Sequence, residues 1–111
     1  MLAFLFYVNA WHFFMGWTVY ILYSPTLDRF YVGCSNDFDG RLVKHGVKFY
    51  GKESFTAKAD DWEVFLHFNC KDEKQAKSIE RHIKKMKSRN FIENLKSYPE
   101  IIQKLILKYS I

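Results

Sequence analysis

Charged residues are absent from the first 27 positions, although they make up 26% of this 111-residue chain. Nine of the 21 aromatic side chains lie in the same stretch, so it is not a solvated tail. Cysteine is also scarce, because two residues build no disulfide framework and form no paired zinc motif. We therefore expect Cys34 and Cys70 to be reduced thiols of a cytoplasmic protein. The chain shows no repeat and no linker, and its length predicts a single domain.

The charge-free opening allows three interpretations. Residues 1–23 nearly reach the roughly 20 apolar residues of a membrane-spanning helix, which would make this a membrane-anchored protein. However, residues 17–23 have the β-branched and aromatic composition of a strand, and residues 1–16 alone are too few to span. We therefore predict no membrane association and treat residues 1–16 as an apolar extension. This extension either covers apolar surface or reflects an upstream start codon, with Met15 as the true start, and we favour the second interpretation.

Positive charge is concentrated in the last third of the sequence. Residues 1–70 carry six basic and seven acidic side chains, whereas residues 71–111 carry eleven basic and five acidic ones. The net charge is therefore −1 in the first part and +6 in the second. Such an asymmetry suits a surface that binds a polyanion, and it equally suits a solvated, lysine-rich helical face.

The pattern of apolar residues predicts three strands and four helices. Strands are expected over residues 17–23, 29–33 and 62–68, and helices over 37–45, 72–87, around 91–95 and after Pro99. The short turn at residues 24–28 makes the first two strands an antiparallel hairpin. Residues 62–68 are mostly apolar, so we expect this strand to lie in the centre of the sheet. Residues 46–61 read as a long loop.

This order of elements predicts an α+β fold of the α/β-sandwich type, a three-stranded, mainly antiparallel sheet flanked by helices. The long helix has an apolar stripe at helical spacing, formed by Ala76, Ile79, Ile83 and Met86, which suits packing on a sheet. We expect one domain body over residues 17–97. The C-terminal helix of residues 98–111 should pack on the same body.

Taken singly, the polar candidates for a functional site have ordinary structural explanations. Tyr20 and Tyr31 fall on neighbouring strands, and a cross-strand tyrosine pair usually contributes to packing. Arg41 is placed to pair with Asp37 on the surface of a short helix, and Glu80 with Lys84 four residues on. The sequence has no Walker loop, no His-Glu-x-x-His motif and no nucleophile elbow.

Taken together, these residues resemble the GIY-YIG nuclease family. The matching features are Val19-Tyr-Ile21, then Tyr31-Val-Gly33, then Ser35 through Arg41 to His45, and finally Glu80 in a helix after a third strand. The resemblance covers about residues 17–95. The stretch from Phe55 to Glu63 is similar to that of the small stand-alone bacterial members, which are similar in turn to the N-terminal domain of the excinuclease C protein.

The resemblance implies a metal-dependent DNA endonuclease with a definite set of site residues. Tyr20 would lie near the scissile phosphate as the general base, and Tyr31 would orient water or phosphate, with some accounts giving the base role to Tyr31. Arg41 would clamp the phosphate, and His45 would support proton transfer. Glu80 would be the single protein ligand of one Mg²⁺ or Mn²⁺ ion.

Elementary chemistry is consistent with these roles. Mg²⁺ keeps most of its water ligands and needs only one or two carboxylates, as Glu80 would provide. A guanidinium such as that of Arg41 matches two phosphate oxygens at once. A phenol has an ordinary pKa of about 10, so a tyrosine base needs a nearby cation or a relay to His45. Cys34 stands where some relatives carry a lysine, which removes one such cation.

DNA contact would be made mainly through its phosphates. The basic candidates for this contact are Lys44, Lys58, Lys84 and Lys87, with Lys48, Lys52, Arg81, Lys85 and Arg89 nearby in the sequence. No separate sequence-reading module is present, so selectivity would be for DNA structure, as in repair, or would come from a partner protein. The alternative is a non-catalytic relative that binds nucleic acid without turnover. The oligomeric state is left open by the sequence.

Overall fold

The computed structural model describes residues 16–46 and 58–111, without the side chains of residues 44–46. The apolar extension and most of the predicted long loop therefore lie outside the described residues. The strands are β1 (Trp17–Ser24), β2 (Arg29–Ser35) and β3 (Glu63–Cys70). The helices are α2 (Phe38–Gly46), α3 (Glu73–Met86), α4 (Arg89–Ser97) and α5 (Glu100–Lys108). Both the order and the bounds of these elements agree closely with the pattern of the sequence.

The three strands form one antiparallel sheet in the order β2-β1-β3. The prediction that β3 is the central strand was therefore wrong, because β1 occupies the centre and β3 an edge. Residues 19–22 of β1 are at most 1% exposed, since helices cover both faces of this strand. In β3, by contrast, Val64 is 42% exposed, and a bulge interrupts the pairing beside Ile21 and Leu22. The central strand, which is buried on both faces, is therefore identified better by its lack of charged residues than by its apolar content.

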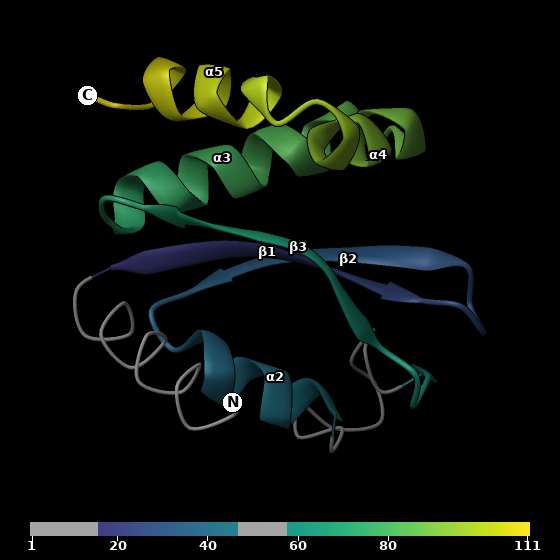
Figure 1. Ribbon diagram of the computed structural model, residues 1–111. Coiled ribbons are helices and arrows are strands. Elements are labelled where there is room, and N and C mark those ends of the chain that lie inside the picture. Colours follow the sequence, from purple (N-terminus) through teal and green to yellow (C-terminus); the bar gives the residue numbers. More distant parts are fainter. Residues whose placement is uncertain (1–15, 47–57) are drawn as a thin grey trace.

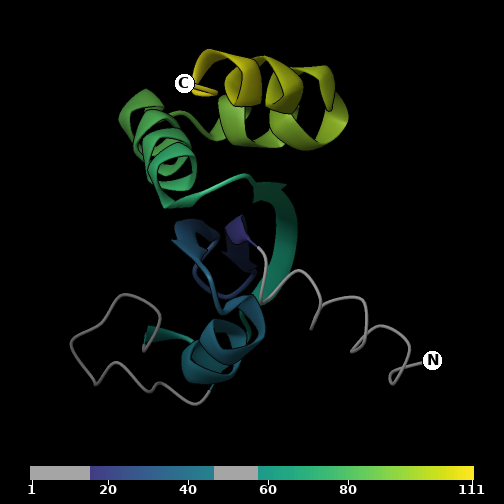
Figure 2. The same cartoon turned by 90° about the vertical axis from the view of Figure 1, so that its left-hand side faces the viewer.

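Helices lie on both faces of the sheet. Figure 1 shows α2 on one face and α3 on the other, with α4 and α5 on the same side as α3. Figure 2, turned by 90°, shows the same separation of α2 from the other three helices. The predicted α/β sandwich is therefore confirmed, and the sheet has two chemically different faces.

The main hydrophobic core fills the space between the sheet and α3. Val19 and Ile21 of β1 meet Ala76, Ile79 and Ile83 of α3 in one buried cluster. Ile102 and Leu105 of α5 belong to the same cluster, and the buried Gln75 side chain donates a hydrogen bond to the Ile106 carbonyl at 3.0 Å. Met86, the predicted last member of the apolar stripe, is 46% exposed, because α3 ends there.

Local capping sets the ends of the helices that carry the site. Asp72 caps α3 by accepting a hydrogen bond from the Gln75 amide, and Lys87 ends the helix in the left-handed conformation with φ 48°. Ser88 then caps α4 by accepting from the Phe91 amide. Only Lys87 and Ser88 separate the two helices, so the junction is short and turns sharply.

None of the helices that the structure describes is long and apolar enough to cross a membrane.

Candidate active site

The two motif tyrosines lie on the face of the sheet that α2 covers. Tyr20 pairs with Gly33 and Leu22 pairs with Tyr31, so the tyrosines are diagonal neighbours on adjacent strands. Their ring centroids are 6.5 Å apart. The alternation of side chains along the strands predicted this shared face, and the register confirms it.

Gly33 makes room for the Tyr20 ring. A Cβ atom at Gly33 would lie 2.6 Å from Tyr20 Oη and 2.7 Å from Cζ, which is closer than carbon and oxygen atoms approach without displacement. The hydroxyl end of Tyr20 therefore lies directly over the backbone of β2. This contact explains why the second motif has a glycine two residues after Tyr31.

Aromatic side chains that the sequence analysis did not single out surround the tyrosine pair. Phe38 of α2 lies 5.4 Å from the Tyr20 ring and 5.0 Å from the His67 ring, measured between centroids. Trp62 makes an edge contact with Tyr31 at 6.5 Å. Burial lowers the pKa of His67, so this neighbour favours the neutral imidazole. Phe38 was recognisable as an apolar helix position, but nothing local in the sequence linked it to Tyr20.

Exposure separates the roles that the two tyrosines can take. Tyr20 is 1% exposed and belongs to the largest fully buried side chains of the described residues, whereas Tyr31 is partly exposed. A group must reach solvent or substrate to act on a water or a phosphate. Tyr31 meets this condition in the structure, whereas Tyr20 is buried among the rings of Tyr31 and Phe38.

Arg41 belongs to α2, the helix that covers the tyrosine face. Ser35 accepts a hydrogen bond from the Asp37 amide at 2.8 Å, and Asp37 in turn accepts from the Gly40 amide at 2.8 Å. The Asp37 carboxylate thus caps the helix. A Cβ atom at Gly40 would collide with this carboxylate, so the unusual glycine in the first turn is what allows the cap.

Arg41 follows one turn after Asp37, and its amide donates to the Asp37 carbonyl at 2.9 Å. The Arg41 side chain is partly buried. His45 and Lys44 belong to the last turn of α2, but their side chains lie outside the described residues. The position of His45 four residues after Arg41 puts both on the same side of the helix.

Glu80 lies on α3 and faces β2 from the other side of the sheet. Its carboxylate forms the predicted pair with Lys84, with Oε1 and Nζ 3.6 Å apart, and its side chain is 22% exposed. The Cys34 thiol of β2 lies near Glu80, and burial together with the charge of this carboxylate raises the pKa of Cys34 to about 12. Cys34 therefore stays a neutral thiol beside Glu80.

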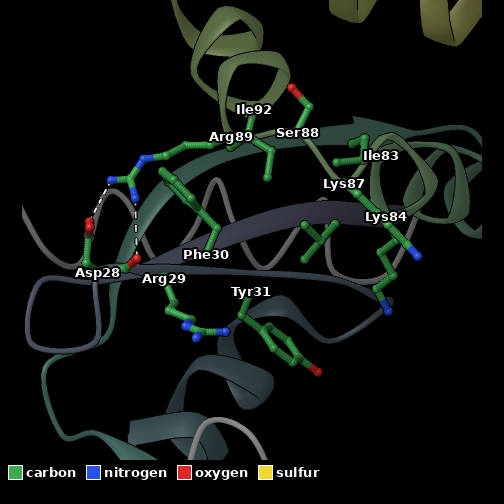
Figure 3. Close-up of a pocket in the computed structure, with 11 residues that line it drawn as sticks. Asp28, Arg29, Phe30, Tyr31, Ile83, Lys84, Lys87, Ser88, Arg89 and Ile92 are labelled. Atoms are coloured by element: carbon green, nitrogen blue, oxygen red, sulfur yellow. Dashed lines mark hydrogen bonds and ion pairs between the residues drawn. The ribbon is translucent and has the colours of Figure 1, made fainter.

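A groove of about 530 Å³ runs along the open edge of β2 and joins the two sides of the sheet. It is lined by Asp28, Arg29, Phe30, Tyr31, Val32, Ile83, Lys84, Lys87, Ser88, Arg89 and Ile92. Figure 3 shows Lys84 and Lys87 on the α3 side of this β2 groove, while the Tyr31 ring points to the side away from Arg89 and Ile92. The β2 groove is therefore where a tyrosine of one face meets the basic side chains of the other.

Arg89 closes one end of the β2 groove. Its Nη2 atom lies 2.6 Å from Asp28 Oδ1 (Figure 3), as the dashed line shows. Tyr23 Oη donates to the same oxygen at 2.6 Å. The guanidinium also stacks over the Phe30 ring at 5.4 Å. This arrangement lowers the pKa of Asp28, mainly through the hydrogen bond from Arg89. Arg89, one of the basic candidates in the sequence, is thus engaged in holding the hairpin turn to α4.

The remaining basic predictions fall in different places. Lys84 and Lys87 line the β2 groove, and Lys58 is exposed at the start of the second described segment. Lys48 and Lys52 lie outside the described residues. Of the predicted DNA contacts, the structure therefore brings Lys84 and Lys87 together beside Tyr31. Arg29, which the sequence analysis did not name, joins them there.

The donor set near Glu80 suits a hard divalent cation better than a transition metal. Within residues 16–46 and 58–111 no group of three His, Cys, Asp or Glu side chains is close enough to cage a metal. Glu80 offers one partly exposed carboxylate, and Mg²⁺ binds through one or two carboxylates while keeping its waters. Lys84, which now neutralises Glu80, would release the carboxylate when a cation binds.

The class of this domain is shown by comparison with known protein families. A family model described as GIY-YIG catalytic domain matches residues 16–94. The chain therefore belongs to the GIY-YIG family, whose members are generally nucleases that use a divalent metal. No curated protein and no solved structure matches the chain. The match runs from just before β1 into α4 and includes Tyr20, Tyr31, Arg41 and Glu80.

Proposed function

We propose that this protein is a divalent-metal-dependent endonuclease that hydrolyses phosphodiester bonds of structured DNA, as in repair, in the cytoplasm. One observation carries the proposal: the β2 groove brings a partly exposed Tyr31 together with the cationic side chains of Arg29, Lys84 and Lys87. Cations attract the phosphate backbone, and a phenol beside them is placed to handle the attacking water. The family match supports the same chemistry.

In this proposal the two sides of the sheet have separate tasks. Tyr31 orients the attacking water at the phosphate, and Tyr20, buried beneath it, fixes the position of the Tyr31 ring. Arg41 binds two oxygens of the phosphate from α2. His45, on the same side of α2 as Arg41, would accept the phenol proton of Tyr31 as the Tyr31 oxygen takes a proton from the attacking water. Tyr20 as the general base is the alternative assignment within the same site.

Glu80 does not line the β2 groove, but it pairs with the groove residue Lys84 one helical turn away and would hold the Mg²⁺ or Mn²⁺ ion there. When bound, such an ion stabilises the charge that develops on the phosphate and the leaving oxygen. Lys84 neutralises Glu80 in the absence of the ion and is then free to contact the DNA backbone. Lys44, Lys58 and Lys87 would extend the contact with phosphates, and a partner protein would add selectivity.

A nuclease screen tests this function directly. Full-length protein is incubated with flapped, nicked and branched DNA in the presence of Mg²⁺ or Mn²⁺, and products are resolved on denaturing gels. We expect cleavage that Glu80→Ala abolishes. Glu73→Ala is the matched control, because Glu73 also lies on α3 and pairs with a lysine four residues on, Lys77, at 3.2 Å. Cleavage that survives in Glu80→Ala would overturn the assignment of the metal ligand.

The same screen separates the nuclease from a non-catalytic relative. The observation that favours the second candidate is the 1% exposure of Tyr20, which keeps one motif tyrosine away from solvent. That candidate predicts salt-sensitive binding to the DNA panel with no products at any metal concentration. Detection of metal-dependent products eliminates it.

A further inference from the structure

A second hollow, on the side of α3 away from β2, carries chemistry that the active site does not use. It has a volume of about 320 Å³ and is lined by Ser78, Arg81, His82, Lys85 and Met86 of α3 together with Tyr109, which follows α5. We call it the α3–α5 hollow. None of these residues lines the β2 groove, so the two sites are separate.

Three polar side chains of the α3–α5 hollow come from one face of α3. Ser78, Arg81 and Lys85 are spaced three and four residues apart, so their side chains are neighbours on α3. His82 is held at the edge of the hollow by a hydrogen bond of 2.8 Å between its Nδ1 atom and Tyr109 Oη. The imidazole also makes an edge contact with the Tyr109 ring, with centroids 5.7 Å apart. The hollow therefore has one wall fixed by the His82–Tyr109 contact and two exposed cationic side chains, Arg81 and Lys85.

Positive charge in the hollow has no acidic counterpart. In the part of the chain that the structure describes, no carboxylate forms an ion pair with Arg81 or Lys85. The two carboxylates within α3, Glu73 and Glu80, are each paired with another lysine. The pKa of His82 is lowered by burial and by the nearby charge of Lys108. The potential at the mouth of the hollow is therefore positive, and it would favour an anion.

A guanidinium, an ammonium and a hydroxyl on one helical face match the oxygens of a phosphate group. We propose that the α3–α5 hollow binds a backbone phosphate of DNA, at a point outside the phosphodiester held in the β2 groove. This inference rests on the proposed function, because it places a second contact on the same substrate. Glu80 and Arg81 are consecutive on α3, so the two phosphate sites lie on two sides of one helix, whose diameter is about 10–12 Å with side chains.

DNA binding in EDTA tests the second site without cleavage. Fluorescence anisotropy with a labelled flapped duplex compares the full-length protein with Arg81→Ala/Lys85→Ala. We expect a dissociation constant about tenfold higher and a shallower salt dependence, with the slope of log K against log salt reduced by about 1 to 2. The control Lys74→Ala/Lys104→Ala removes the same charge from exposed helical positions outside both sites and should change the constant less than about twofold.

Nuclear magnetic resonance of the imidazole of His82 locates the contact. Addition of a short unlabelled duplex to isotope-labelled protein should shift the His82 ring signal, assigned with His82→Gln, and Arg81→Ala/Lys85→Ala should abolish that shift. Alanine is the best helix former, so the exposed substitutions are expected to leave the fold intact, which circular dichroism checks.

The outcomes separate this inference from the nuclease proposal. If the protein cleaves DNA but Arg81→Ala/Lys85→Ala binds like its control, the second site is overturned and the nuclease stands. If no DNA is cleaved but the double variant still loses affinity and salt dependence, the second site stands and the nuclease fails. If Arg81→Ala/Lys85→Ala instead loses the binding of the parent protein to anionic phospholipid vesicles while its DNA binding is unchanged, the inference is also overturned.

Discussion

At the residue scale, we expect the two motif tyrosines to respond differently to the removal of their hydroxyl groups. Tyr31→Phe keeps the ring but removes the hydroxyl that reaches the β2 groove, so we expect loss of cleavage by about 100-fold or more with little change in thermal stability. Tyr20→Phe removes a buried hydroxyl, so we expect a loss of stability of about 1 kcal/mol and a smaller loss of rate. Cleavage rates and thermal unfolding of both variants decide which tyrosine acts on the substrate and which one supports the fold. A Tyr20→Phe protein as stable as the parent but inactive would instead assign the base role to Tyr20.

Gly33 gives a second prediction at this scale. Gly33→Ala forces a methyl group against Tyr20 Oη and Cζ, so the Tyr20 ring must shift. We expect a loss of about 1–3 kcal/mol in the free energy of unfolding, measured by urea denaturation. In a double-mutant cycle, Tyr20→Ala should absorb much of this cost, because the ring that collides is gone. If the stability losses of Gly33→Ala and Tyr20→Ala are additive, the collision with the Tyr20 ring is not the cause of the loss in Gly33→Ala.

Asp61 carries the pH dependence of the hairpin turn. Its carboxylate accepts hydrogen bonds from Ser24 Oγ at 2.6 Å and from the Thr26 amide at 2.8 Å, which lower the pKa of Asp61 to about 2. Because the folded protein holds this pKa below its ordinary value, the contribution is present above about pH 4 and is lost as the pH falls toward 2. Thermal unfolding between pH 2 and 6 should therefore show less acid sensitivity in Asp61→Asn. If Asp61→Asn loses thermal stability below pH 4 as steeply as the parent protein does, Asp61 is not the source of the acid sensitivity.

At the scale of elements, the junction between α3 and α4 links stability to binding. Lys87 adopts φ 48°, which glycine adopts at less cost, and its side chain lines the β2 groove. Lys87→Gly should therefore raise the free energy of unfolding by up to about 1 kcal/mol while weakening DNA binding about threefold to tenfold. Urea denaturation and anisotropy on the same preparation measure the two effects. A variant that loses both stability and affinity would contradict this account of the junction.

The elements themselves were largely predictable from the sequence. The apolar pattern located the seven elements of the described residues, and Asp72 caps α3 where the sequence predicted that this helix begins. The position of β3 was not predictable from its apolar content, because an edge strand that packs one face on helices is also apolar. The groups around Tyr20 were not predictable either, because His67 is placed beside it by the pairing of β1 with β3 and Phe38 by the packing of α2 on the sheet. Both contacts join residues far apart in the sequence, so local patterns do not reveal them.

At the scale of the whole molecule, α5 extends the domain beyond the family match. The match ends at residue 94, yet Ile102 and Leu105 are buried in the same core as α3. Removal of residues 98–111 would expose this surface and leave the Gln75 side chain without the Ile106 carbonyl. We expect a loss of about 3–6 kcal/mol, seen as a large fall in the midpoint of thermal unfolding. A truncated protein as stable as the full chain would show that α5 is peripheral.

The central place of β1 also bears on how the chain is synthesised. Its partner β2 follows within five residues, but β3 ends only at Cys70, 46 residues after Ser24. At about 5–20 residues per second, the ribosome needs several seconds to deliver β3. During that interval one side of β1 has no strand beside it, and β1 has no charged residue to deter a neighbouring chain. The nascent hairpin is therefore the stage at which this protein is most exposed to aggregation, and the stage at which a chaperone would be of most use.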